Sequence, residues 1–317
     1  MKPKILVSRA LPETVEARLA YSFDATFNKT DAPMTAAVLC QAMRDYDALV
    51  PTVSDRIDAE VLLTHGRRVG MIANIGVGYS NIDTDIAREA GIRVSNTPDV
   101  LTDATADIAL LLILAATRRS YAAETKLRQN RWGGFSIVDG LGSSIQGKIL
   151  GIVGMGRIGR ATARRAALGF GMNVVFYNRS SVDDLDFEAT QLGSIDAVLS
   201  QADVVSIHVP GGSTPLVTAE HIAAMKPSAY LVNTARGDSI DQTALIDALS
   251  EGRIAGAGLD VFEAEPFVPD VLRELENVTL LPHIGSATTE VRTAMGMLAA
   301  DNLEAFFAGK DLPCTVV

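Results

Sequence analysis

Three residues in the second half of the chain are of types that carbonyl chemistry uses, and each follows an apolar segment that we predict to be a strand. They are Arg236, Glu265 and His283. Ligands of open parallel sheets bind beyond the carboxyl ends of the strands, so we expect these side chains at one sheet edge. A guanidinium can orient a carboxylate, and a histidine can donate a proton near neutral pH. A carboxylate beside that histidine orients the ring and favours its protonated form.

Taken singly, each of these residues has a simpler interpretation. An arginine after a strand is most often a surface or salt-bridge residue, and a lone histidine is most often structural. Glu263 and Glu265 could be solvated loop charges. Because all three follow successive strands of one fold, we favour catalytic roles: Arg236 orients the substrate, His283 supplies the proton and Glu265 orients the imidazole.

A glycine motif within residues 151–159 must position a cofactor beside these groups. Gly154, Gly156 and Gly159 have the spacing G-x-G-x-x-G, after an apolar strand and before a helical pattern. Only glycines let the backbone approach a dinucleotide pyrophosphate, and the helix N-terminus presents N–H groups and partial positive charge to it. A second strand, 173–177, follows where a βαβ unit needs one. The alternative is a glycine turn without a ligand.

The end of that second strand indicates which nicotinamide cofactor is preferred. NAD-specific sites place Asp or Glu about 20 residues past the glycines, where it bonds the ribose hydroxyls. This chain has Asn178, Arg179 and Ser180 there. Since Arg179 and Ser180 can bind a 2′-phosphate, the sequence predicts NADP(H) over NAD(H), with NAD(H) still possible. The alternative is that Arg179 points to solvent and both cofactors are accepted.

Composition and charge limit the classes of protein that this chain could be. With 317 residues, 48% of them hydrophobic and 21% charged, we expect a well-packed protein of about two domains. The net charge of −10 argues against nucleic acid or an anionic membrane as partner. Cys40 and Cys314 lack motif spacing, and no apolar run approaches membrane-spanning length. We therefore expect a soluble cytoplasmic protein, and we predict no metal site.

Apolar runs alternate with helical patterns, which is typical of parallel sheets covered by helices. One helical pattern extends from about residue 102 to 129, and an amphipathic tail at 288–308 should pack on the first domain. The predicted domains are residues 1–99 with 287–317, and residues 100–286. The predicted strands are 4–8, 46–50, 69–75 and 92–95, then six strands of a doubly wound dinucleotide fold at 149–153, 174–177, 204–208, 229–233, 256–260 and 278–281.

A second glycine cluster, within residues 74–83, follows a strand of the first domain. Its consecutive backbone N–H groups could form a nest for a carboxylate, and the alternative is an ordinary strand-to-helix turn. Residues 49–54 are expected to touch the substrate side chain. The segments that carry a family resemblance include this cluster; they are 76–79, 96–107, 147–159, 233–237, 259–266 and 282–288.

Together these segments resemble the D-isomer-specific 2-hydroxyacid dehydrogenases over nearly the whole chain. The resemblance implies a Rossmann cofactor domain, a discontinuous flavodoxin-like substrate domain, a homodimer, and NAD(P)-dependent reduction of 2-oxo acids. The family's catalytic groups fall on Arg236, Glu265 and His283. Implied substrate contacts are Val53, Val77, Gly78, Arg236 and His283. Implied cofactor contacts are Thr105, Gly154, Met155, Gly156, Arg157, Ile158, Gly159, Asn178, Arg179, Ser180, His208, Val209, Pro210, Thr214, Thr234, Ala235, Arg236, Asp260, His283 and Gly285.

Within the family, segments 100–107 and 283–288 look most like glyoxylate/hydroxypyruvate reductases. Formate dehydrogenases place Gln where this chain has Glu265, and phosphoglycerate dehydrogenases often carry a further regulatory domain. Ser80 replaces a common Asp, with little effect expected. Two alternatives remain: a family enzyme for a bulkier 2-oxo acid or phosphoglycerate, and a nicotinamide-sensing binding protein like the C-terminal-binding corepressors.

Overall fold

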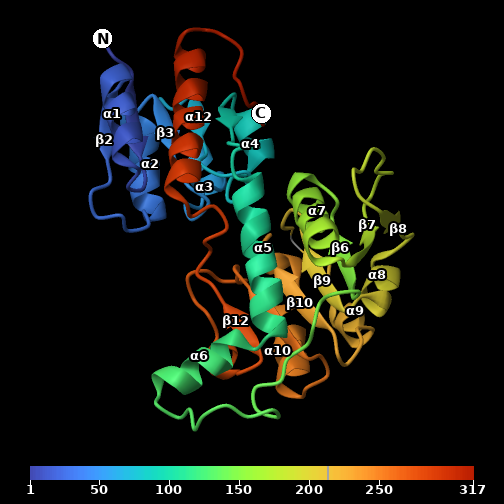
Figure 1. The fold of residues 1–317 in the computed structure, drawn as a ribbon. Helices are drawn as coiled ribbons and strands as arrows, with labels where there is room; N and C mark the ends of the chain where they lie inside the picture. Colours follow the sequence, from blue (N-terminus) through green and yellow to red (C-terminus); the bar gives the residue numbers. More distant parts are fainter. Residues whose placement is uncertain (213) are drawn as a thin grey trace. The chain divides into compact units, whose positions relative to one another are not determined.

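The computed structural model describes residues 1–212 and 214–317, and the chain divides into two compact units. Unit 1 is Met1–Leu101 with Ser286–Val317, and unit 2 is Thr102–Gly285. In each unit, helices flank a parallel sheet (Figure 1). This confirms the predicted fold class of two parallel-sheet α/β domains.

Unit 1 contains a five-stranded sheet in the order β2-β1-β3-β4-β5, the flavodoxin-like order. Its central strands are short and apolar, as expected of parallel strands covered on both faces. The edge strand β2 was not predicted, because its sequence DATF has no apolar run. The strands are β1 (Lys4–Val7), β2 (Asp24–Phe27), β3 (Ala48–Val50), β4 (Met71–Ala73) and β5 (Arg93–Ser95).

The C-terminal helix α12 belongs to unit 1 and packs on α1. Gly296 permits this close approach, since a Cβ there would lie 2.6 Å from Val15 Cγ1. Arg18 of α1 forms ion pairs with Asp301 at 2.6 Å and Glu304 at 2.8 Å. The helices of unit 1 are α1 (Glu13–Ser22), α2 (Ala36–Asp45), α3 (Ala59–Leu62), α4 (Thr84–Glu89) and α12 (Thr289–Phe307).

Unit 2 contains a seven-stranded sheet in the order β12-β11-β10-β9-β6-β7-β8, whose β8-β7-β6-β9-β10-β11 part has the doubly wound dinucleotide-binding order. The prediction of six strands was wrong by one. The additional strand β8 lies at the edge, is partly to fully exposed, and has no apolar run. The strands are β6 (Ile149–Val153), β7 (Asn173–Tyr177), β8 (Ala189–Gln191), β9 (Val204–Ile207), β10 (Tyr230–Asn233), β11 (Gly256–Leu259) and β12 (Val278–Leu280).

The helical pattern predicted from 102 to 129 is two helices rather than one, with the break at Arg119, whose φ is 52°. α5 packs closely on the sheet, because Gly258 of β11 leaves room for Leu112. Among the described residues, no helix is both long and apolar enough to cross a membrane. The helices of unit 2 are α5 (Thr102–Thr117), α6 (Ser120–Arg128), α7 (Arg157–Phe170), α8 (Ile195–Gln201), α9 (Ala219–Ala223), α10 (Gln242–Ser250) and α11 (Asp270–Glu274), with a 3₁₀ turn, η1, at Gly237–Ser239.

Candidate active site

A histidine–carboxylate pair lies at the carboxyl edge of the seven-stranded sheet. His283 Nδ1 lies 2.7 Å from Glu265 Oε2, and Glu265 Oε1 accepts the Phe262 N–H at 3.0 Å. Burial raises the pKa of Glu265, but the hydrogen bond and charge of His283 lower it more, so its net pKa is below the ordinary value. The carboxylate is therefore ionised at neutral pH. Within the described part of the chain, His283 Nε2 has no partner and can face a substrate.

The turn that carries His283 is held by buried groups. His283 has φ 54°, and its N–H donates to Asp260 O. Asp260 is 1% exposed, and its carboxylate accepts the N–H groups of Ile284 at 2.7 Å and Gly285 at 2.8 Å. Thr105 donates its hydroxyl to Gly285 O at 3.1 Å. Thr105 and Asp260, which we expected to contact the cofactor, thus place the histidine.

Arg236 lies on the turn after β10, and side chains within that turn fix its backbone. Asn233 accepts the Ala235 N–H at 2.9 Å and donates to Arg236 O at 2.8 Å. Gly237 lets this turn lie against the segment leading to Glu265, since a Cβ there would be 1.9 Å from the carbonyl carbon of Phe262. The sheet edge therefore brings the predicted arginine, glutamate and histidine loops together.

The charge environment of Arg236 includes an acid that sequence reasoning missed. Burial lowers the pKa of Arg236, while the charges of Glu265 and Asp238 raise it; the net pKa is lowered, but a guanidinium stays protonated in proteins. Burial raises the pKa of Asp238, and its buried Oδ1 has no partner among the described residues. No apolar strand end or motif marks Asp238 in the sequence.

The glycine loop between β6 and α7 has the form that a dinucleotide requires. Gly154 has φ 97°, and a Cβ there would lie 2.5 Å from His208 O. A Cβ at Gly159 would lie 2.2 Å from Gly154 O, whereas one at Gly156 would meet no atom within 4 Å. Gly156 is the N-cap of α7 and has no side-chain cap. The outer glycines thus allow close packing, and the middle one leaves open space at a helix N-terminus, which fits a pyrophosphate.

The first residue after β7 is Asn178, where an NAD-specific site has Asp or Glu. Asn178 accepts the Met155 N–H at 3.2 Å and donates to Ser180 Oγ at 3.2 Å. Gln191, on the unpredicted strand β8, holds this loop through Ser180 O at 3.0 Å. Arg179 is exposed and forms no ion pair in residues 1–212 and 214–317. A guanidinium is therefore available at this position.

Of the other expected cofactor residues, His208 and Val209 lie against the glycine loop. His208 Nε2 lies 2.9 Å from Ser206 Oγ, and burial lowers the pKa of His208 to about 4, so its ring is neutral at neutral pH. Thr234 Oγ1 is buried without a partner among the described residues. Val209 contacts the Gly154 turn. Arg157 and Ile158 begin α7, Ala235 is half-buried, and Pro210 and Thr214 are exposed beside residue 213, which lies outside the described residues.

In unit 1, the glycine loop after β4 presents two open backbone N–H groups. Asn96 donates to Val77 O at 2.9 Å, and Asn74 donates to Gly78 O at 3.1 Å. The N–H groups of Val77 and Gly78 find no acceptor in the part of the chain that the structure describes. In an ordinary turn, a carbonyl oxygen within the turn would accept one of these two N–H groups. The geometry therefore favours the predicted nest for a carboxylate.

Unit 2 therefore has the features of a nicotinamide-dependent oxidoreductase: a dinucleotide fold, an open glycine loop, and a histidine–glutamate pair at the same sheet edge. Residues 110–285 match the model of the D-isomer specific 2-hydroxyacid dehydrogenases, NAD binding domain. The chain is 42% identical over 320 residues to a glyoxylate reductase of Thermococcus litoralis, covering 99% of this chain and 96% of that protein.

Solved structures show the same similarity. An NADPH-dependent glyoxylate/hydroxypyruvate reductase from Sinorhizobium meliloti, in complex with NADP and malonate, has a TM-score of 0.89 and 36% identity, covering 100% of this chain and 97% of that one. A glyoxylate reductase from Paecilomyes thermophila has a TM-score of 0.88 and 33% identity, with coverage of 99% and 98%. The chain belongs to the D-isomer-specific 2-hydroxyacid dehydrogenases. It is an NAD(P)-dependent oxidoreductase.

Proposed function

We propose that the protein is an NADPH-dependent reductase of small 2-oxo acids, which yields D-2-hydroxy acids. Glyoxylate and hydroxypyruvate are the leading substrates, in keeping with the names of its relatives. The observation that carries this proposal is the hydrogen bond of 2.7 Å between His283 and Glu265. The charge of Arg236 lies near Glu265 at the same sheet edge. Such a group can orient a carbonyl, polarise it and supply a proton.

A bound nicotinamide supplies the hydride to the carbonyl carbon. The proton comes from His283 Nε2 and goes to the carbonyl oxygen, which becomes the hydroxyl. Glu265 holds Nδ1, so Nε2 faces outward, and its negative charge stabilises the imidazolium before transfer. Arg236 holds the substrate carboxylate and polarises the neighbouring carbonyl oxygen. In unit 1, the N–H groups of Val77 and Gly78 are open donors that can bind a carboxylate.

The cofactor proposal rests on Arg179, and a comparison of NADPH with NADH tests it. The wild type should have a higher kcat/KM for NADPH, and Arg179→Ser should lower that value about tenfold by removing a charged hydrogen bond. Arg253→Ser changes another exposed arginine of unit 2, whose side chain is 44% exposed, and should alter neither value. Equal efficiencies with the two cofactors in the wild type would exclude the NADPH preference.

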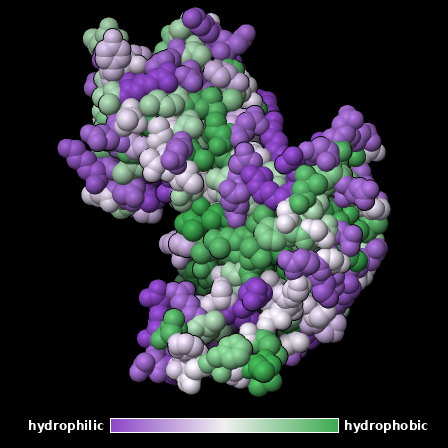
Figure 2. Space-filling model, in the orientation of Figure 1, coloured by the Kyte–Doolittle hydropathy of each residue, from purple (hydrophilic) through white to green (hydrophobic). Residues whose placement is uncertain are grey.

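We further propose that two copies associate through α5, α6 and the segment 129–141. Hydrophobic side chains gather over α5 in Figure 2, and Phe135 is 90% exposed. Exposed apolar patches of this kind mark interaction sites. Sedimentation of Phe135→Asp should show a monomer where the wild type shows a dimer. The exposed large hydrophobic residues of this surface are Leu111, Tyr121, Leu127, Trp132, Phe135, Ile137, Val138 and Leu141.

An NADPH oxidation assay against a panel of 2-oxo acids separates the proposal from its alternatives. Turnover of only bulky 2-oxo acids, or of phosphohydroxypyruvate, would point to another enzyme of the family. Cofactor binding without turnover would point to a nicotinamide-sensing binding protein. We also infer a cytoplasmic location, since a chain with only two cysteines suits a reducing compartment.

A further inference from the structure

The carboxyl edge of the unit 1 sheet holds a guanidinium with no assigned role. In the strand order of this sheet, β1 and β3 are neighbours at the switch point, where ligands of open sheets bind. Arg9 follows β1, and the segment 51–54 follows β3. Arg9 and this segment therefore meet at the place where the fold favours a ligand.

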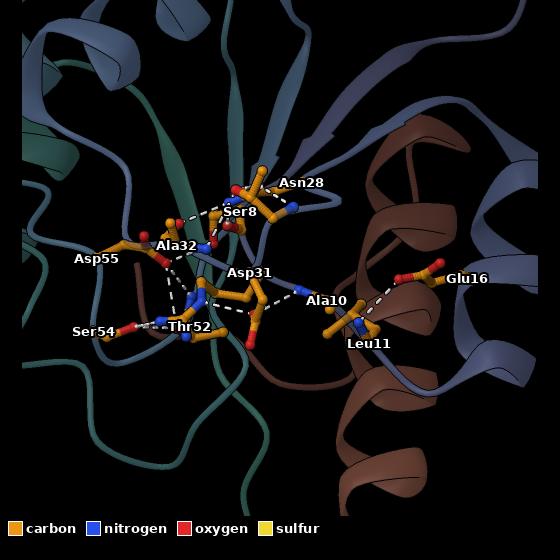
Figure 3. Close-up of polar contacts among 12 residues, drawn as sticks. Ser8, Ala10, Leu11, Glu16, Asn28, Asp31, Ala32, Thr52, Ser54 and Asp55 are labelled. Atoms are coloured by element: carbon orange, nitrogen blue, oxygen red, sulfur yellow. Dashed lines mark hydrogen bonds and ion pairs between the residues drawn. The ribbon is translucent and has the colours of Figure 1, made fainter.

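Arg9 is held on two sides by Asp31 and Ser54, both of which are labelled in Figure 3. Its Nε donates to Asp31 Oδ1 at 2.9 Å, and its Nη1 donates to Ser54 Oγ at 2.8 Å. The side chain of Arg9 is 23% exposed and that of Asp31 is 55% exposed. In residues 1–212 and 214–317, Arg9 Nη2 has no partner. The Arg9 guanidinium is thus fixed by Asp31 and Ser54, and its Nη2 remains an open hydrogen-bond donor.

A partly buried network, which the Thr52 hydroxyl links to Ser54, fixes the loops around this guanidinium. Asp55 is fully buried, and its Oδ2 accepts the Ser8 hydroxyl at 2.5 Å and the Thr52 N–H at 2.8 Å. Asn28 donates to the carbonyl oxygens of Ser8 and Ala32, both at 2.8 Å. These contacts join β1 to the loops after β2 and β3 without Arg9, so packing alone does not explain the arginine.

The same loop connects Arg9 to the carboxylate nest. Val53 precedes Ser54, and its Cγ1 would lie 2.6 Å from a Cβ at Gly76, the first residue of the nest loop. Thr52 also forms a β-bridge to Ile75, directly before that loop. The β3 loop therefore packs on the nest loop on one side and bonds Arg9 on the other.

We propose that Arg9 and Ser54 bind the substituent on C3 of the substrate and select 2-oxo acids with an uncharged hydroxyl there. This inference rests on the proposed function. Since Asp31 neutralises the arginine, a neutral hydroxyl gains a hydrogen bond at Nη2 without meeting excess positive charge. A second carboxylate or a phosphate would meet the exposed Asp31 carboxylate and be disfavoured.

The test compares hydroxypyruvate with glyoxylate, which has a hydrogen in place of C3. Arg9→Met retains an unbranched stem and removes the donors; it should lower kcat/KM for hydroxypyruvate about tenfold and for glyoxylate less than about twofold. Arg56→Met is the matched control, because Arg56 follows the same loop and is 86% exposed; both values should stay unchanged. Asp31→Asn should raise kcat/KM for oxaloacetate, which has a second carboxylate, relative to hydroxypyruvate.

Equal losses on both substrates with Arg9→Met would assign the arginine a structural role and overturn the inference, as would no change on either. A lower oxaloacetate efficiency with Asp31→Asn would also contradict it. A wild-type enzyme that reduces neither glyoxylate nor hydroxypyruvate would refute the proposed function itself, which distinguishes the two failures.

Discussion

The carboxyl edges of the two parallel sheets use different chemical groups. At the edge of the five-stranded sheet, the open groups are backbone N–H donors at Val77 and Gly78, and Arg9 is already paired with Asp31. At the edge of the seven-stranded sheet, the open groups belong to ionisable side chains, above all His283. The edge of the five-stranded sheet can bind an anion with groups that do not titrate. The edge of the seven-stranded sheet can transfer a proton.

The largest effect should come from His283→Ala. Removal of a general acid costs about 10²- to 10⁴-fold in rate, so kcat for reduction should fall by that amount while the Kd for NADPH stays nearly unchanged. Steady-state kinetics and a fluorescence titration with NADPH measure the two quantities. His65→Ala, which changes an exposed histidine of unit 1, should leave both intact. Parallel loss of turnover and cofactor affinity would mean that His283 is structural.

Two glycine substitutions should separate folding from cofactor binding in unit 2. Gly154→Ala adds strain at φ 97° and a contact of 2.5 Å with backbone, so Tm should fall, reflecting a loss of about 1–3 kcal/mol. Gly156→Ala meets no protein atom, so Tm should hold while the Kd for NADPH rises about tenfold or more. Unchanged NADPH affinity in Gly156→Ala would show that the pyrophosphate lies elsewhere.

Asn96→Ala tests the recognition edge of unit 1. Loss of the hydrogen bond to Val77 O should loosen the nest and raise KM for glyoxylate about tenfold, with a smaller effect on kcat. Asn173→Ala removes a comparable side-chain bond, to Gly147 O in unit 2, and serves as the control. If Asn96→Ala altered NADPH affinity and left the glyoxylate KM unchanged, the division of roles between the two edges would be wrong.

The smallest effect should be a displaced pH profile in Glu265→Gln. The pKa of Glu265 is lowered from its ordinary value of 4.5, so the carboxylate is ionised from mildly acid pH upward and supports the imidazolium. Removal of this charge should change the pH dependence of the reduction rate above mildly acid pH, where the wild-type carboxylate is ionised. His208→Asn should leave that dependence unchanged, because the pKa of His208 is about 4 and its ring is already neutral there. A wild-type pH profile in Glu265→Gln would separate Glu265 from proton transfer.

Strand ends were the most informative feature of the sequence, because apolar strands flanked by polar residues specify both the sheet and its ligand edge. Arg236, Glu265 and His283 were found in this way, and the structure brings their loops together. Strands β2 and β8 were missed because edge strands lack apolar runs. The helix break at Arg119 depends on a left-handed backbone that no glycine or proline announces.

Roles that depend on contacts between distant segments could not be predicted from the local sequence pattern. The position of Asp260 at a strand end predicts a cofactor contact. In the structure its carboxylate accepts the backbone N–H groups of Ile284 and Gly285, which belong to another loop. Gln191 holds a loop 11 residues earlier in the chain, and the burial that raises the pKa of Asp238 arises only in the folded protein. Arg9 is separated from Ser54 by 45 residues, so only the folded sheet shows that their side chains are in contact.

The most direct test is NADPH oxidation by the wild-type protein with glyoxylate and hydroxypyruvate, with chiral analysis of the product. The account predicts turnover of both acids, a lower efficiency with NADH, and D-glycerate from hydroxypyruvate. Tight NADPH binding without turnover of any 2-oxo acid, or formation of the L-isomer, would contradict it.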